Sequence, residues 1–160
     1  MKQKDFNIKK YFDLMTSCIQ LGSDSHDNKI TKTKLAKLMY LCDFAFYAQT
    51  GRSISNAQYL KLERGPVPLE YFSCLDTLRD VKKITVEKKG KAEMLTLVKN
   101  DEQICLSADE RKLVKKVCDK WRESSTAEIV KFTHNQIPWA ISFDGQNVPY
   151  SLIIQEEHVY

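Results

Sequence analysis

Apolar residues are concentrated between positions 33 and 50, where they surround one carboxylate, Asp43. Leu35, Leu38 and Cys42 keep the three- and four-residue spacing of one helix face. Further apolar residues cover much of the remaining helix surface: Met39, Tyr40, Leu41, Phe44, Phe46 and Tyr47. A helix that is apolar on most sides belongs in a protein interior. The sequence therefore predicts a central buried helix over about residues 33–50, ended by Gly51.

Two further helices are predicted beside the central one from the same spacing. Residues 6–21 form the first, and Gly22 supplies the left-handed conformation that ends it. Pro68 suits the first position of the second helix, because its ring fixes φ near the helical value. We expect this second helix to lie against the central helix through five apolar residues on one face: Leu69, Phe72, Leu75, Leu78 and Val81.

The rest of the chain predicts two capped helices and two extended segments. Capping boxes at residues 107–110 and 125–128 each open a helix, the second ending near His134. Residues 83–98 read as a β-hairpin around a charged turn, and in residues 58–63 apolar and polar residues alternate from Leu60 as in a half-buried strand. We expect a mainly helical α+β fold of about five helices. Residues 148–154 are expected to add one more short strand or helix.

Composition is typical of a water-soluble globular protein. The 160 residues are 42% hydrophobic and 29% charged, which suits one domain over residues 1–160. No stretch approaches the roughly 20 apolar residues of a membrane span, and the amino terminus is unlike a signal peptide. We therefore expect a cytoplasmic protein without a membrane partner. A net charge of +4 from dispersed lysines indicates solvated helix faces more than a nucleic-acid surface.

The cysteine and histidine spacings predict no metal site and no disulfide. Five cysteines is an odd number, and they are scattered without a CxxC pair: Cys18, Cys42, Cys74, Cys105 and Cys118. The three histidines lie at positions 26, 134 and 158 and match no zinc pattern. Phosphate-binding and dinucleotide-binding motifs are absent from the sequence, so no cofactor is expected. Thiol titration of the denatured, unreduced protein should find all five thiols free.

Asp43 and His134 are the candidate acid and base, and Cys42 is a candidate nucleophile beside Asp43. Neighbouring helix residues point about 100° apart, and Cys42 lies on an apolar face that disfavours its thiolate. We therefore interpret Asp43 as a buried carboxylate that needs a partner. The expected partners are the turn at residues 64–67 or the hydroxyl of Tyr59. His134, in the last turn of its helix, is interpreted as structural.

Several segments together resemble the Panacea, or SocA-like, antitoxin domain family over about residues 5–155. They are the KLAKLMYLCDF segment at 34–44, Gly51 with Arg52, the RGPVP turn at 64–68, and His134 with Pro138 and Trp139. The family more commonly has glutamine or threonine where this chain has Ala36. The motif positions with family or structural roles are Leu38, Tyr40, Asp43, Gly51, Tyr59, Gly65, Pro66, Pro68, His134 and Trp139.

The resemblance implies an antitoxin of toxin–antitoxin pairs and prophages that neutralises a partner toxin, encoded nearby, by direct protein contact. The family includes the phage-associated protein GepA. Its relative SocA instead delivers its toxin to the ClpXP protease. Family membership implies no enzymatic activity. Two alternatives remain: a prophage-associated helix-turn-helix regulator built on residues 110–121 and 128–134, and a hydrolase built on Asp43 and His134. The second helix of the proposed regulator, residues 128–134, carries just one lysine or arginine, Lys131, which argues against DNA binding.

The expected partner-binding surface lies in residues 51–68, where polar and aromatic residues accompany a rigid proline turn. Its candidate contacts are Arg52, Tyr59 and Arg64. Arg64 is also a candidate partner of Asp43. We expect Arg52→Glu or Arg64→Glu to weaken toxin neutralisation while leaving thermal stability nearly unchanged.

Overall fold

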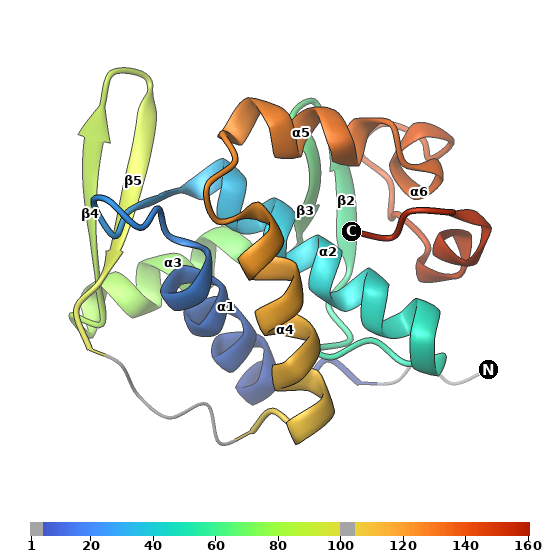
Figure 1. Cartoon of the computed structure of the whole chain (residues 1–160), viewed down its shortest axis with the longest axis horizontal. Helices are drawn as coiled ribbons and strands as arrows, with labels where there is room; N and C mark the ends of the chain where they lie inside the picture. Colours follow the sequence, from blue (N-terminus) through green and yellow to red (C-terminus); the bar gives the residue numbers. More distant parts are fainter. Residues whose placement is uncertain (1–4, 100–104) are drawn as a thin grey trace.

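The computed structural model of the chain describes residues 5–99 and 105–160 and places one helix, α2 (Lys32–Thr50), through its middle (Figure 1). This confirms the predicted central helix. Thr31 caps its start by accepting a hydrogen bond from the Lys34 amide, and Gly51, with φ of 72°, ends it. All residues from 34 to 46 are buried. Neighbouring elements therefore cover α2 on every side.

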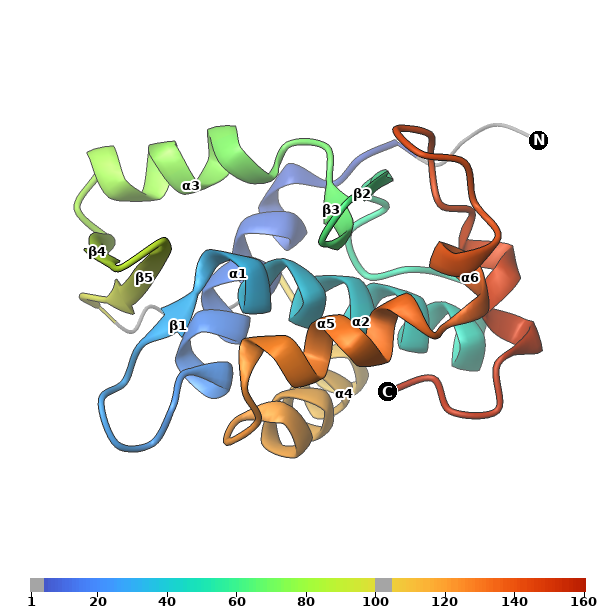
Figure 2. The ribbon, with the colours of Figure 1, turned by 90° about the horizontal axis from the view of Figure 1, so that it is seen from above.

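The other helices surround α2, and Figure 2 shows α3 and one hairpin on one side of it and α4 and α5 on the other. α1 and α4 contact each other and α2, while α5 and the 3-10 helix η1 also contact α2. Both capping boxes form, at Ser107 and at Ser125. The helices are α1 (Ile8–Gly22), α3 (Tyr71–Asp80), α4 (Ala108–Trp121), α5 (Thr126–His134), α6 (Ile137–Ala140) and η1 (Tyr150–Gln155).

Two small antiparallel sheets complete a mainly helical α+β fold, as predicted. The first has the order β1 (Ile30–Thr31), β5 (Ala92–Leu97), β4 (Ile84–Lys89), and β4 with β5 forms the expected hairpin. The second pairs β2 (Tyr59–Leu62) with β3 (Gly65–Pro68) across a turn at residues 63–64. Within residues 5–99 and 105–160, the structure contains no helix with the length and apolarity that a membrane crossing requires.

The helix after Pro68 differs from its prediction in start and packing. Pro68 is the last residue of β3, and α3 begins only at Tyr71 because residues 65–68 are paired with β2. Leu75 and Leu78 are buried as predicted, whereas Leu69, Phe72 and Val81 are exposed. Leu69 and Val81 lie outside the shorter helix. α3 packs against β4 and reaches α2 through the Tyr71 hydroxyl, which donates to the Lys32 carbonyl oxygen.

Gly22 is the last residue of α1 and not the predicted left-handed cap. The following residue, Ser23, is extended, and its amide donates back to the Ile19 carbonyl oxygen. A Cβ atom at Gly22 would lie 2.3 Å from Cδ1 of Leu38. The close approach of α1 to α2 therefore favours glycine here, because a larger residue would displace the end of the Leu38 side chain.

Candidate partner-binding site at the β2–β3 hairpin

Asp43 is fully buried and its carboxylate accepts four hydrogen bonds, which confirms that it needs partners. Oδ1 accepts from the amides of Ile54 and Ser55, both at 2.9 Å. Oδ2 accepts from the Ser55 hydroxyl at 2.6 Å and from the Tyr59 hydroxyl at 2.7 Å. Burial raises the pKa of Asp43, and these four donors oppose that shift. Of the two partners predicted for Asp43, the Tyr59 hydroxyl is confirmed and the turn at residues 64–67 is wrong.

Tyr59 is not available to a partner, because its side chain is only 1% exposed. Its ring packs edge-on against Phe44 and Tyr40, with centroids 5.5 and 5.8 Å away. Its bond to Asp43 fixes which face of β2 points inward, and Leu62 consequently faces solvent. The expected contact through Tyr59 is therefore wrong. The strand expected at residues 58–63 is confirmed as β2, but its buried face carries Tyr59 and not Leu62.

The turn after β2 is held by Lys37, a second ionisable residue buried in α2. Its side chain is 1% exposed and its Nζ donates to the Pro66 carbonyl oxygen at 3.0 Å. Gly65 adopts φ of 106°, and a Cβ there would lie 2.6 Å from Cε of Lys37. Burial lowers the pKa of Lys37 to about 7. The donors to Asp43 are Ile54, Ser55 and Tyr59, so Arg64 is not its partner.

His134 and Trp139 support the same hairpin from the opposite end of the sequence. Their rings stack with centroids 4.0 Å apart and planes 11° apart. Trp139 Nε1 donates to the Leu62 carbonyl oxygen at 3.3 Å, and Lys61 Nζ lies 4.3 Å from the Trp139 ring centroid. Burial and the charge of Lys37 lower the pKa of His134, while a contact with the Arg64 backbone opposes them.

Three residues from two distant parts of the sequence therefore converge on one exposed turn. Lys37 comes from α2, His134 from α5 and Trp139 from just beyond it in α6. They contact the backbone at residues 66, 64 and 62, respectively. Glu63 and Arg64, at the tip, remain exposed. The fold thus presents this turn on a rigid support.

A pocket of about 260 Å³ lies beside the turn, between α2, the hairpin and α3. Phe72 and Leu62 expose apolar surface at it, with 56% and 38% of their areas accessible. Arg64 adds positive charge, and Lys32 at the same pocket pairs with Glu93 at 2.7 Å. We call the exposed turn and this pocket the hairpin site; its lining includes Lys32, Lys37, Leu62, Glu63, Arg64 and Phe72.

Arg52 lies apart from the hairpin site. It follows the carboxyl end of α2, and Thr50 is roughly 20 Å from Lys37 along the helix at 1.5 Å per residue. Sequence reasoning missed Lys37 and Phe72 as members of the site. A lysine inside an otherwise apolar helix was a usable signal, of the same kind as Asp43, whereas the exposure of Phe72 depends on how α3 packs.

Comparison with known proteins places these features in a family. A family model described as "Antitoxin SocA-like, Panacea domain" matches residues 35–140, more than half of the chain. No curated protein and no solved structure gives a match. The matched segment contains the residues that hold the turn, Lys37, His134 and Trp139. The chain therefore belongs to the antitoxin SocA-like, Panacea domain family.

Proposed function

We propose that this chain neutralises a partner toxin by direct contact and that the contact is centred on the hairpin site. The observation that carries the proposal is the convergence of Lys37, His134 and Trp139 on an exposed turn. A surface that is already ordered binds without the entropic cost of ordering it. Arginine is one of the residue types that dominate binding energies at protein interfaces, and phenylalanine is enriched there, so exposed Arg64 and Phe72 suit a contact surface.

The chemistry of the hairpin site favours a partner segment with apolar side chains and one carboxylate placed at Arg64 and away from the neighbouring Glu63. Phe72 and Leu62 offer apolar area, and the exposed guanidinium of Arg64 suits a carboxylate. Contact of this kind would serve both routes that the sequence resemblance implies, occlusion of the toxin and delivery of the toxin to ClpXP. The two routes differ in whether the toxin survives in the cell.

We further propose that the chain is not an enzyme. The Asp43 carboxylate accepts four hydrogen bonds from protein donors and has no access to solvent. Cys42 is fully buried, and burial raises the pKa of its thiol. These features argue against Asp43 and Cys42 as groups that meet a substrate.

DNA binding through α4 and α5 remains the alternative, and the charge of α5 does not favour it. The exposed charged side chains of α5 are Glu128 and Lys131, which cancel. A recognition helix normally gains affinity from net positive charge facing the phosphates. We therefore prefer the antitoxin function to a regulatory one.

Reversing the charge of Arg64 is expected to abolish protection while leaving the fold intact. Arg64→Glu should weaken binding of the toxin by about 10- to 100-fold, as loss of an interface hot spot does. Because Arg64 is exposed, the melting temperature of the variant should match that of the wild type. The measurement is growth of cells that co-express each variant with the toxic reading frame expected beside its gene, alongside a melting curve.

Arg52→Glu is the matched control, since it reverses an exposed arginine at the far end of α2. Placing the contact at the hairpin site replaces the weakening that the sequence led us to expect for Arg52→Glu, and this variant should now protect as well as the wild type. Full protection by Arg64→Glu, or equal loss in both variants, would place the interface elsewhere. Repeating the assay in cells without ClpXP separates the two routes, because delivery fails there and occlusion does not.

A further inference from the structure

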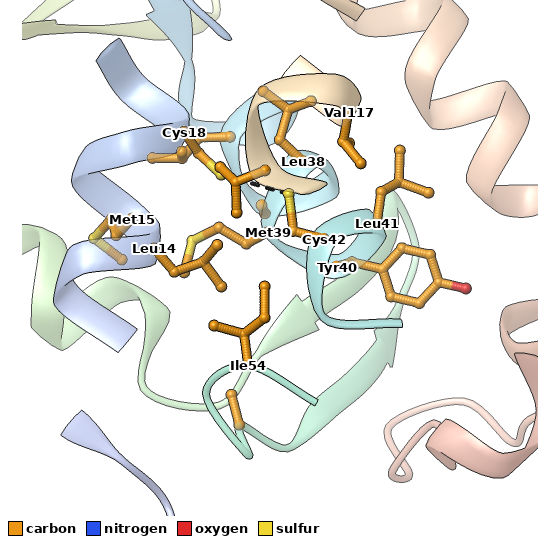
Figure 3. Close-up of a cluster of buried hydrophobic side chains, with 14 of the residues drawn as sticks. Leu14, Met15, Cys18, Leu38, Met39, Tyr40, Leu41, Cys42, Ile54 and Val117 are labelled. Atoms are coloured by element: carbon orange, nitrogen blue, oxygen red, sulfur yellow. Dashed lines mark hydrogen bonds between the residues drawn. The ribbon is translucent and has the colours of Figure 1, made fainter. Parts of the chain in front are cut away.

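Three cysteine thiols that are far apart in the sequence meet in the core. Cys18 comes from α1, Cys42 from α2 and Cys118 from α4, and each is 0% exposed. Their Sγ atoms all lie within 4.8 Å of one another, and those of Cys18 and Cys42 are 4.0 Å apart (Figure 3). The spacing argument against a metal therefore does not apply to these three residues, since the fold assembles what the sequence separates.

The separation of the sulfurs is close to that of three ligands on one ion. Metal–sulfur bonds of about 2.3 Å in a trigonal plane place the sulfur atoms about 4 Å apart. The cluster has to contract by less than about 1 Å to reach this arrangement. Each sulfur is carried by a different packed helix, so the three are held in place without a flexible loop.

The ligand number and surroundings distinguish among thiophilic ions. Thiolate ligands select copper(I), zinc and iron–sulfur clusters. Structural zinc is almost always four-coordinate. Among residues 5–99 and 105–160, the group of histidine, cysteine and acidic side chains at this position has only three members. Figure 3 shows Leu38, Met39 and Val117 near this position, and each of the three cysteines is 0% exposed. A site closed to solvent in this way offers no water as a fourth ligand.

We propose that Cys18, Cys42 and Cys118 form a buried site for a soft monovalent ion, copper(I), in three-fold sulfur coordination. Each thiol that binds as a thiolate releases one proton to solvent, and the oxidation state of copper does not change. The ion links α1, α2 and α4. The site is separate from the hairpin site and does not depend on the antitoxin function.

The three thiols are buried on three helices that pack against one another, and no path from solvent reaches them. Since the cluster is sealed from solvent, the ion enters while the helices are apart, as the chain folds.

The test is refolding of the reduced protein with one equivalent of copper(I) under anaerobic conditions, followed by competition with a chromophoric copper(I) chelator. The wild type should retain one equivalent and melt at a higher temperature than the metal-free protein. Cys42→Val should lose more than about 100-fold in copper affinity, which is more than the loss on mutating a residue that only contacts a metal ligand. The matched control is Cys74→Val, which removes a buried thiol of α3 outside the cluster and should bind as the wild type does.

X-ray absorption of the loaded wild type provides a second measurement that needs no variant. It should find sulfur neighbours only. Nitrogen or oxygen neighbours, or equal copper retention by the wild type and Cys42→Val, would overturn the site. One equivalent of zinc retained in preference to copper would overturn the choice of ion.

Discussion

Asp43→Ala is expected to lower the free energy of unfolding by about 2–4 kcal/mol, the range for loss of a buried polar network. The substitution leaves the amides of Ile54 and Ser55 and the hydroxyl of Tyr59 without their acceptor in a region closed to water. Buried donors without partners carry the full cost of desolvation. Urea unfolding followed by circular dichroism measures the change.

Two further variants calibrate the Asp43 result. Tyr59→Phe removes one of the four hydrogen bonds and should cost about 1–2 kcal/mol. Asp144→Ala removes a carboxylate whose side chain is 97% exposed and should leave the unfolding midpoint nearly unchanged. An Asp43→Ala protein as stable as the wild type would contradict the role assigned to this network.

The stability of the wild type should rise with pH relative to Lys37→Met by on the order of 2 kcal/mol between pH 7 and 9. The pKa of Lys37 is about 7 in the folded chain, and that of lysine in an unfolded chain is about 10.4. Between these values the unfolded chain binds one more proton than the folded chain, so raising the pH favours folding. Methionine at position 37 does not titrate and lacks this dependence.

Denaturant unfolding of both proteins at several pH values gives this difference directly. Lys112→Met, at an exposed position of α4, is the matched control and should follow the wild type at each pH. Parallel curves for the wild type and Lys37→Met would mean that Lys37 keeps an ordinary pKa in the folded chain.

Periodicity predicted the elements of this fold better than it predicted how they meet. The central helix, the capped helices and the β4–β5 hairpin follow from local patterns and caps. The partners of Asp43 at residues 54–55 depend on the path of a loop, which no spacing encodes. The start of α3 was missed because strand pairing of residues 65–68 outweighed the preference of Pro68 for a helix start.

The candidate site was predicted in part for the same reason. The sequence indicated Arg64 and the proline turn because glycine and proline mark turns. It also offered Tyr59 as a surface contact, but the Tyr59 hydroxyl donates to the buried Asp43 carboxylate. The contacts of Lys37 and Trp139 with the hairpin span 29 and 77 positions along the chain. Only a folded chain brings such residues together.

Asp43 and Lys37, two buried ionisable residues of α2, hold the two ends of the segment from residue 54 to residue 66. Asp43 accepts hydrogen bonds from residues 54–55. Lys37 lies six positions earlier, about 9 Å along the helix, and donates to the Pro66 carbonyl oxygen. Glu63 and Arg64 lie close to Pro66 in the sequence, and their side chains are exposed. Substitutions at these two positions are therefore expected to leave the fold intact, so the tip of the hairpin can vary in sequence while its position relative to α2 stays fixed.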